Sequence, residues 1–157
     1  MSACEIVRIG PDDWREFRDV RLASLQDAPG AFGATYADWV AASEERWRRR
    51  LVDVPLTLVA RTDVGPVGVV CGAEGADGVE LISMWVAASH RGTGLAGELI
   101  AEVVAWARGE GRATFLMVRD DNAAAIHSYL RAGFVDLGVP DDWPEGELTE
   151  RRMRHGG

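Results

Sequence analysis

The stretch MWVAASHRGTGLAG, residues 84–97, decides the fold of this chain. An apolar run stops there at a glycine-rich loop, which opens directly into an amphipathic segment over residues 94–108. A strand, a loop and a helix start in this order present unpaired amides and the positive end of a helix dipole. Glycines let a ligand approach the backbone, and Arg91 adds a charged, forked donor. The sequence therefore predicts a site for a phosphate-bearing ligand, with a diphosphate as the expected group.

Other phosphate-binding motifs fit this loop less well. Residues 92–97 formally match the G-x-G-x-x-G pattern of dinucleotide-binding proteins. That pattern normally sits at the strand end, whereas here residues 87–91 intervene, and roughly 60 residues follow, too few to complete a doubly wound domain. A P-loop is excluded because it needs a lysine, and all 17 basic residues are arginine. A dinucleotide-binding protein and an ordinary strand-to-helix turn remain the alternatives.

Size and composition indicate one soluble domain over residues 1–157. Apolar residues make up 47% of the chain, no apolar run approaches the length of a membrane span, and no secretory signal is visible. We therefore expect a cytoplasmic protein that does not bind membranes. The formal net charge of −8 argues against a nucleic-acid partner and mildly favours a cationic substrate. Cys4 and Cys71 are expected to be buried thiols rather than a disulfide or a metal pair.

The pattern along the chain predicts an α/β fold. Strands are expected near residues 5–9, 56–61, 67–72, 79–86, 113–118, from 134, and over 148–154. Helices are expected from residue 12 to near 29, over 41–51, over 94–108, and over 122–131 with Asp121 as the cap. A hairpin thus precedes a β-loop-α-β unit with a right-handed, parallel crossover. The predicted fold is a mixed central sheet with helices on both faces.

Two motifs in this order resemble those of the Gcn5-related N-acetyltransferase (GNAT) superfamily. Residues 91–96, RGTGLA, are similar to its Arg-x-x-Gly-x-Gly/Ala pyrophosphate-binding loop. Residues 122–134, NAAAIHSYLRAGF, resemble its C-terminal Asn-x-x-Ala-x-x-x-Tyr motif followed by Gly-Phe. The second motif begins 28 residues after Gly94, a spacing that one helix and one strand fill. The resemblance implies a single N-acetyltransferase domain with a splayed parallel core.

The resemblance also implies a coenzyme, acetyl-CoA, and a set of contacts for it. Its pantetheine arm would lie along the strand before the loop and enter between Val86 and Val118. Its diphosphate would be wrapped by the loop. The residues implied in coenzyme binding are Met84, Trp85, Val86, Arg91, Gly92, Thr93, Gly94, Leu95, Ala96, Gly97, Asn122 and Ala125. For Asn122 a helix-cap role is the alternative.

The reaction implied is N-acetylation of a primary amine by direct attack within a ternary complex. Tyr129 matches the family's general acid, and a phenol can protonate a departing thiolate. Glu80 matches a base used by some members, and strand alternation predicts that it shares a face with Met84 and Val86. The alternatives are a core tyrosine and a solvent-facing glutamate. A non-catalytic module that binds or senses acyl-CoA is the alternative function.

The acceptor is implied to be a small-molecule or peptide amine. Phe32, Tyr36 and Trp39 recur at helical spacing where the family often forms its acceptor pocket, although core packing explains them too. The arginines at 46 and 48–50 are expected on a solvated helix face, with contact to an acidic group as the alternative. The three histidines show no metal-ligand spacing, so no metal is expected. Homodimers are common in the superfamily, but no residue here demonstrates one.

Overall fold

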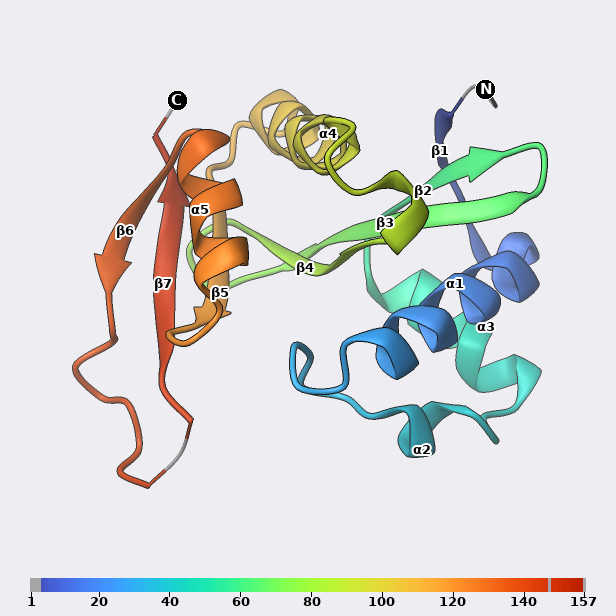
Figure 1. Ribbon diagram of the computed structural model, residues 1–157, viewed down its shortest axis with the longest axis horizontal. Coiled ribbons are helices and arrows are strands. Elements are labelled where there is room, and N and C mark those ends of the chain that lie inside the picture. The colour runs from blue at the N-terminus through green and yellow to red at the C-terminus, as the bar shows by residue number, and fades with distance from the viewer. Residues whose placement is uncertain (1–3, 147, 157) are drawn as a thin grey trace.

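A computed structural model describes residues 4–146 and 148–156, which form a mixed seven-stranded sheet (Figure 1). Its spatial order is β1-β2-β3-β4-β5-β7-β6. The strands are β1 (Glu5–Arg8), β2 (Leu56–Thr62), β3 (Gly65–Glu74), β4 (Val79–Val86), β5 (Thr114–Arg119), β6 (Phe134–Gly138) and β7 (Glu150–His155). Neighbouring strands are antiparallel except β4 and β5, which are parallel. The predicted mixed sheet is confirmed, and one parallel pair is not the doubly wound sheet that the dinucleotide alternative requires.

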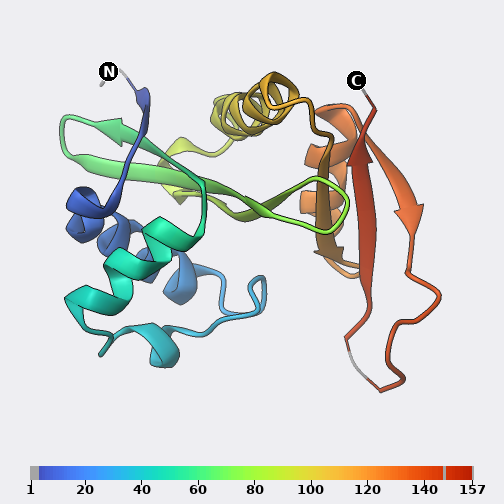
Figure 2. The same ribbon diagram turned by 180° about the vertical axis from the view of Figure 1, so that it is seen from behind.

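Helices cover both faces of this sheet, as Figures 1 and 2 show from opposite sides. The helical elements are η1 (Pro11–Asp13), α1 (Trp14–Asp27), α2 (Tyr36–Trp39), α3 (Glu44–Asp53), η2 (Ala88–His90), α4 (Leu95–Gly109) and α5 (Ala123–Arg131). Residues of α1 and α3 form one hydrophobic cluster, which is centred on Phe17 and Trp47. Residues of α4 form a second cluster on the opposite face around Leu99 and Ile100. In the described ranges, no helix is both long and apolar enough to cross a bilayer.

Local hydrogen bonds set two helix starts that differ from the predicted ones. Helix α3 begins at Glu44, later than expected, because the Ser43 hydroxyl accepts a hydrogen bond from a backbone amide one turn on. The prediction that Asp121 caps α5 is wrong. Asn122 Oδ1 accepts from the Ala125 amide at 3.2 Å, while Asp121 is engaged by Arg119 at 2.7 Å.

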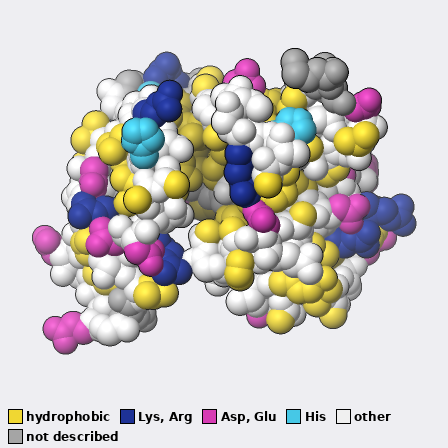
Figure 3. All heavy atoms as spheres, viewed as in Figure 1, with side chains coloured by type: hydrophobic (Ala, Val, Ile, Leu, Met, Phe, Trp, Pro, Cys, Tyr) yellow, Lys and Arg dark blue, Asp and Glu magenta, His cyan; other side chains and the backbone are white. Residues whose placement is uncertain are grey.

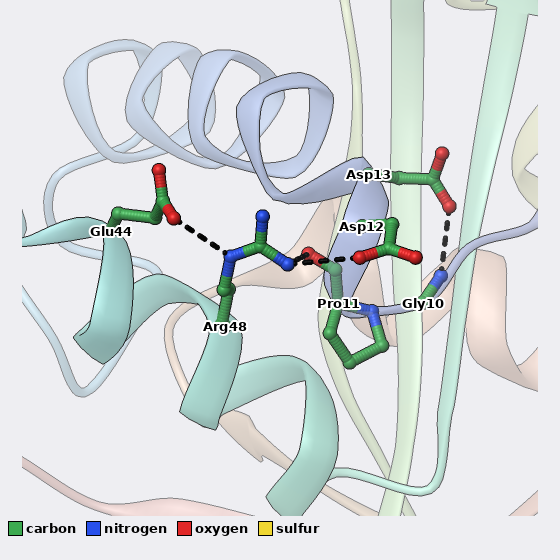
Figure 4. Close-up of polar contacts among 6 residues, drawn as sticks. All are labelled: Gly10, Pro11, Asp12, Asp13, Glu44 and Arg48. Carbon is green, nitrogen blue, oxygen red and sulfur yellow. Dashed lines mark hydrogen bonds and ion pairs between the residues drawn. The ribbon is translucent and has the colours of Figure 1, made fainter.

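The two N-terminal helices are also tied together by polar contacts (Figure 4). Arg48 on α3 donates from Nε to Glu44 at 3.1 Å and from Nη1 to Asp12 at 3.0 Å and to the Pro11 carbonyl at 3.3 Å. Since Asp12 and Pro11 lead into α1, these bonds hold α3 against the start of α1. Each surface contact of this kind contributes little to stability on its own.

Strand β4 contains a β-bulge that the sequence did not reveal. Trp85 pairs with Val69 and Ile82 pairs with Cys71, so two residues of β4 face one residue of β3 between these pairs. Ser83, at the bulge, has a positive φ of 58°. A bulge adds one residue to one strand and bends it. A positive φ in a residue other than glycine is held in place only by surrounding structure.

The bulge reverses the side-chain alternation along β4. Ile82 packs in the cluster with α1 and α3, whereas Met84 and Val86 belong to the cluster with α4. Glu80, two residues before Ile82, shares the face of Ile82. The prediction that Glu80 and Ile82 lie on one face with Met84 and Val86 is therefore wrong, because the extra residue shifts the period-two pattern by one.

The parallel strands β4 and β5 separate soon after they meet. They pair only at Val79 with Thr114 and at Glu80 with Phe115. Past these residues the two strands diverge, and the opening between them is visible in Figure 1. This splayed core was predicted and is confirmed. It leaves one edge of β4, from Leu81 onward, without a neighbouring strand.

The two cysteines differ in burial and are both free. Cys71 lies in β3 and is buried, as predicted. Cys4 is exposed just before β1, so the expectation that it is buried is wrong. Cys4 lies ahead of the edge strand β1 rather than within it, and the sequence pattern did not show this.

Candidate active site

Two cavities meet in the opening between β4 and β5. Figure 3 shows the surface hollowed between the half of the molecule that holds α5 and the half that holds α1. The larger cavity measures about 490 Å³ and the smaller about 310 Å³. Residues that line both are Ala31, Phe32, Met84, Asn122, Ala125 and Tyr129. These shared residues make the two cavities one continuous site with two arms.

The smaller cavity adjoins the glycine-rich loop before α4. Gly92 and Gly94 have φ of 77° and 88°, in the left-handed region that favours glycine. In the described part of the chain, no carbonyl or side-chain oxygen accepts a hydrogen bond from the backbone amides of residues 92–97. A Cβ added at Gly92, Gly94 or Gly97 would meet nothing within 4 Å. The loop thus presents a row of free donors to open space at a helix N-terminus, as an anion site requires.

Arg91 lines the smaller cavity and also makes contacts that the sequence did not show. Its Nε donates to the Val86 carbonyl at 3.0 Å, and its Nη2 pairs with Asp27 at the end of α1. Asp27 also accepts from Trp85 Nε1 at 2.9 Å. The hydrogen bond from Trp85, and then that from Arg91, lowers the pKa of Asp27. The guanidinium therefore ties the loop to β4 and α1, and the backbone amides are left as the donors for an anion.

The free edge of β4 forms a wall of the smaller cavity. Met84, Trp85 and Val86 all line it, as does Ala96 in the first turn of α4. Because pairing with β5 has already ended, no strand among the described residues lies along this edge beyond Glu80. An extended molecule can bond there as an added strand does. The sequence analysis placed Trp85 with the coenzyme, and in the structure it lines the smaller cavity.

Helix α5 carries Tyr129 to the junction of the two cavities. Asn122 caps the helix, and Ala125 lies one turn on, so the motif's three residues share one face. The Tyr129 ring packs edge-on to Phe134 with a centroid distance of 5.8 Å. Its hydroxyl has no hydrogen-bond partner among the described residues. Burial raises the pKa of Tyr129 to about 12, so the phenol stays protonated near neutral pH.

Glu80 lines the larger cavity but is not isolated there. Its Oε1 lies 2.9 Å from Arg152 Nη2, which comes from β7. Glu150, also on β7, lines the same cavity. Glu150 was not predicted as a site residue. A carboxylate in a short terminal strand cannot be recognised as part of a cavity until β7 is placed beside β5. Among the described residues, no group of three or more His, Cys, Asp or Glu is arranged to hold a metal ion.

Two of the three predicted acceptor-pocket aromatics line the larger cavity. Phe32 and Trp39 do, but Tyr36 does not. The prediction assumed helical spacing from residue 32, whereas only residues 36–39 form a helical turn, which Thr35 begins as the cap. Phe32 precedes this turn in irregular backbone, so the three side chains do not share one face.

Three arginines line the larger cavity: Arg21, Arg50 and Arg119. Arg48 and Arg49 of α3 are paired with Glu44 and Glu45, as a solvated face predicts. Arg50 instead turns inward and lines the cavity, so the expectation for this residue is wrong. Arg21 of α1 lines it too and is 7% exposed. Arg21 sits on the apolar stripe of its helix, four residues after Phe17 and four before Leu25, and that is the signal that could have found it.

Comparison with known proteins agrees with this geometry. Residues 14–134 match the family model for the Acetyltransferase (GNAT) family. An acetyltransferase of the GNAT family from Streptococcus pneumoniae superposes with a TM-score of 0.78 at 22% identity, covering 97% of this chain and 98% of its own. An acetyltransferase of the same family from Staphylococcus aureus gives 0.75 at 15% identity, covering 98% of each chain.

A third similar structure contains the coenzyme. The PaiA N-acetyltransferase of Thermoplasma acidophilum, in complex with coenzyme A, superposes with a TM-score of 0.72 at 19% identity, covering 96% of this chain and 98% of its own. None of the curated proteins compared with the chain matches it in sequence. The structural matches show a shared fold, while the family match extends from the start of α1 to the start of β6 and includes every residue common to both cavities. The chain therefore belongs to the GNAT acetyltransferase family, whose enzymes transfer an acyl group from acyl-CoA.

Proposed function

We propose that this protein is an N-acetyltransferase that moves an acetyl group from acetyl-CoA to a primary amine by direct attack. One observation carries the proposal: among the described residues, Tyr129 is the only titratable side chain that lines both cavities. One cavity adjoins the loop of free amides, and the other holds carboxylates and guanidinium groups. Each substrate has its own arm, and a proton donor stands where the arms meet.

The smaller cavity fits the coenzyme. The free amides of residues 92–96 suit a diphosphate, since the helix dipole favours negative charge at this end. The uncovered edge of β4 at Met84, Trp85 and Val86 suits the amide groups of a pantetheine arm. Asn122 and Ala125 border the same space. When bound there, acetyl-CoA supplies the thioester, and this chain supplies the donors that position it.

The chemistry needs one proton removed from nitrogen and one delivered to sulfur. The amine nitrogen attacks the thioester carbonyl carbon, a C–N bond forms, and the C–S bond breaks. Tyr129 donates its phenolic proton to the departing sulfur and regains a proton from solvent. With a pKa of about 12 the phenol stays protonated at neutral pH, so it is available to donate a hydrogen bond or its proton to the sulfur. The products are the acetylated amine and the free thiol of the coenzyme.

Glu80 is our candidate for the base that takes the proton from nitrogen, directly or through water. A primary amine has a pKa of about 10 and is almost wholly protonated at pH 7, so it must be deprotonated first. Glu80 lines the acceptor arm with one oxygen engaged by Arg152. A covalent acyl-enzyme is not part of the proposal, since neither Cys4 nor Cys71 lines either cavity.

A thiol-release assay across a panel of amines, run beside calorimetry with coenzyme A, tests this function. We expect coenzyme binding and acetyl-CoA-dependent thiol release with at least one amine class, with the acetylated amine identified by mass spectrometry. Coenzyme binding with no turnover across a broad panel would contradict catalysis and favour a non-catalytic acyl-CoA-binding module. Absence of coenzyme binding would contradict both.

A further inference from the structure

The larger cavity contains two guanidinium groups that no carboxylate in the described ranges pairs with, one on the buried Arg21 and one on the half-buried Arg50. Arg21 Nη1 and Arg50 Nη1 are buried without a hydrogen-bond partner in the described part of the chain. Arg21 stacks on Phe32, with Cζ 4.6 Å from the ring centroid, and Arg50 Nη2 donates to Ser83 Oγ at 3.1 Å. These neighbours are neutral. Burial of an unpaired charge is costly, so such groups are normally paired.

The contrast with neighbouring arginines shows that the lack of a partner is specific to this spot. Arg91, Arg119 and Arg152, which also border the two cavities or their rim, are each bonded to an aspartate or glutamate. Burial, and then repulsion from Arg50, lowers the pKa of Arg21 to about 10. In a chain with 25 acidic residues against 17 basic ones, two adjoining arginines without a carboxylate indicate a place kept for an anion from outside.

The cavity is also polarised from one wall to the other. The arginines without a carboxylate partner, Arg21 and Arg50, come from α1 and α3, while Glu80 and Glu150 come from β4 and β7. On that second wall Arg152 pairs with Glu80, and Arg119, which also lines the cavity, pairs with Asp121. The bulge contributes to this arrangement, because it turns Glu80 toward the α1 and α3 side and places Ser83 against Arg50. An amine suits the acidic wall, and a planar oxyanion suits two forked donors.

We infer that the acceptor is a small amine that also carries a carboxylate, held between Arg21 and Arg50 while its amino group faces Glu80. The inference rests on the proposed function, whose acceptor arm it assigns to one chemical class. A cavity of about 490 Å³ suits an amino acid better than a folded protein surface. The same two arginines explain how a chain of net charge −8 accepts an anionic group.

The test compares α-, β- and γ-amino acids with their carboxamides, which keep the amine and remove the negative charge. In the thiol-release assay we expect at least one acid to exceed its amide about tenfold or more in kcat/KM, as a charged hydrogen bond would give. Arg50→Gln should remove this preference mainly through KM, and Arg50→Lys should restore it in part. Arg49→Gln, an exposed neighbour on the same helix, is the matched control and should keep it.

A thermal-shift titration with the same acids and amides gives a readout independent of turnover. Stabilisation by the acid alone, lost in Arg50→Gln and kept in Arg49→Gln, supports the carboxylate site even if no amine is acetylated, in which case only the proposed function fails. Equal turnover of acids and amides overturns the inference and leaves the proposed function intact. A preference that survives in both Arg50→Gln and Arg21→Met also overturns it.

Discussion

The two arms of the site are built in different ways. The arm that we propose for the coenzyme is made from backbone, with free amides on a loop and the open edge of β4 within one continuous segment, residues 84–97. The arm that we propose for the acceptor is made from side chains that four separate elements supply: Arg21, Arg50, Glu80 and Glu150. A backbone site depends on glycine and chain geometry. A side-chain site can change its specificity while the fold stays the same, as a family with one donor and many acceptors needs.

The largest effect is expected at the junction of the arms. Tyr129→Phe removes the hydroxyl and keeps the ring against Phe134. Since general-acid catalysis contributes about 10²–10⁴-fold, kcat should fall at least about a hundredfold. The Kd for coenzyme A should change less than about threefold, because the backbone arm is untouched. Steady-state kinetics and calorimetry on the same preparation measure both.

The chain offers a matched control in its second tyrosine. Tyr36 is part-buried but lines neither cavity, so Tyr36→Phe should leave both constants unchanged. An unchanged kcat in Tyr129→Phe would remove the proposed role of the phenol. A fall in both variants would show that hydroxyl loss acts through the fold.

A single methyl group added to the glycine-rich loop should weaken coenzyme binding. At Gly94, where φ is 88°, alanine favours a negative φ and turns the following amides away from the ligand. We expect the Kd for coenzyme A to rise about tenfold, since each lost charged hydrogen bond is worth about 1.5–3 kcal/mol. Calorimetry measures this change.

Gly111, just beyond the other end of α4 with φ of 71°, is the control for backbone strain. Gly111→Ala should lower the free energy of unfolding by about 1–2 kcal/mol, as we also expect for Gly94→Ala, and it should leave the Kd for coenzyme A unchanged. If both glycine variants lost affinity equally, the free amides would not be what binds the coenzyme.

The unpaired charge of Arg21 should lower the stability of the protein when no ligand is bound. Arg21→Met replaces an unpaired buried charge with an apolar side chain of similar reach. We expect the free energy of unfolding to rise by about 1 kcal/mol, and thermal unfolding to occur about 2–4 °C higher. Differential scanning calorimetry without ligand measures this, with Arg49→Gln expected to stay within about 0.5 kcal/mol of the parent. A clear loss of stability in Arg21→Met would show that Arg21 serves the core.

The smallest effect is expected in the dependence of kcat on pH in the alkaline range. Because burial raises the pKa of Tyr129 from 10 to about 12, kcat should show no falling limb through pH 10. The same shift affects the free energy of unfolding. The contribution of Tyr129 to stability is fully present below pH 10. It is lost progressively as the pH rises toward 12, because the phenol loses its proton at a lower pH in the unfolded chain than in the folded protein. A falling limb near pH 9–10 that disappears in Tyr129→Phe would contradict this burial.

The open amides of the loop and the shared face of Asn122, Ala125 and Tyr129 were predictable because their parts are close in sequence. The loop, the helix start and the Asn-to-Tyr motif each lie within one turn or one helix face. Even there, the pairing of Arg91 with Asp27 was missed, because it joins residues 64 positions apart. The role of Asn122 as the cap was foreseen only as an alternative, and competition from Arg119 for Asp121 decided it.

By itself the sequence determined the order of elements and the loop of unpaired amides, since hydrophobic period, glycine and helix ends are local properties of a chain. The splayed parallel core was expected only because the two motifs resemble those of the GNAT superfamily. Tertiary structure alone decided the acceptor arm. The bulge at Ser83 reversed the faces of β4, the irregular backbone before α2 separated Tyr36 from Phe32, and the packing of α3 on α1 brought Arg50 beside Arg21. The physical reason is that a bulge and a contact between helices depend on residues far apart in the chain. The spacing of residues within one segment does not indicate such long-range contacts.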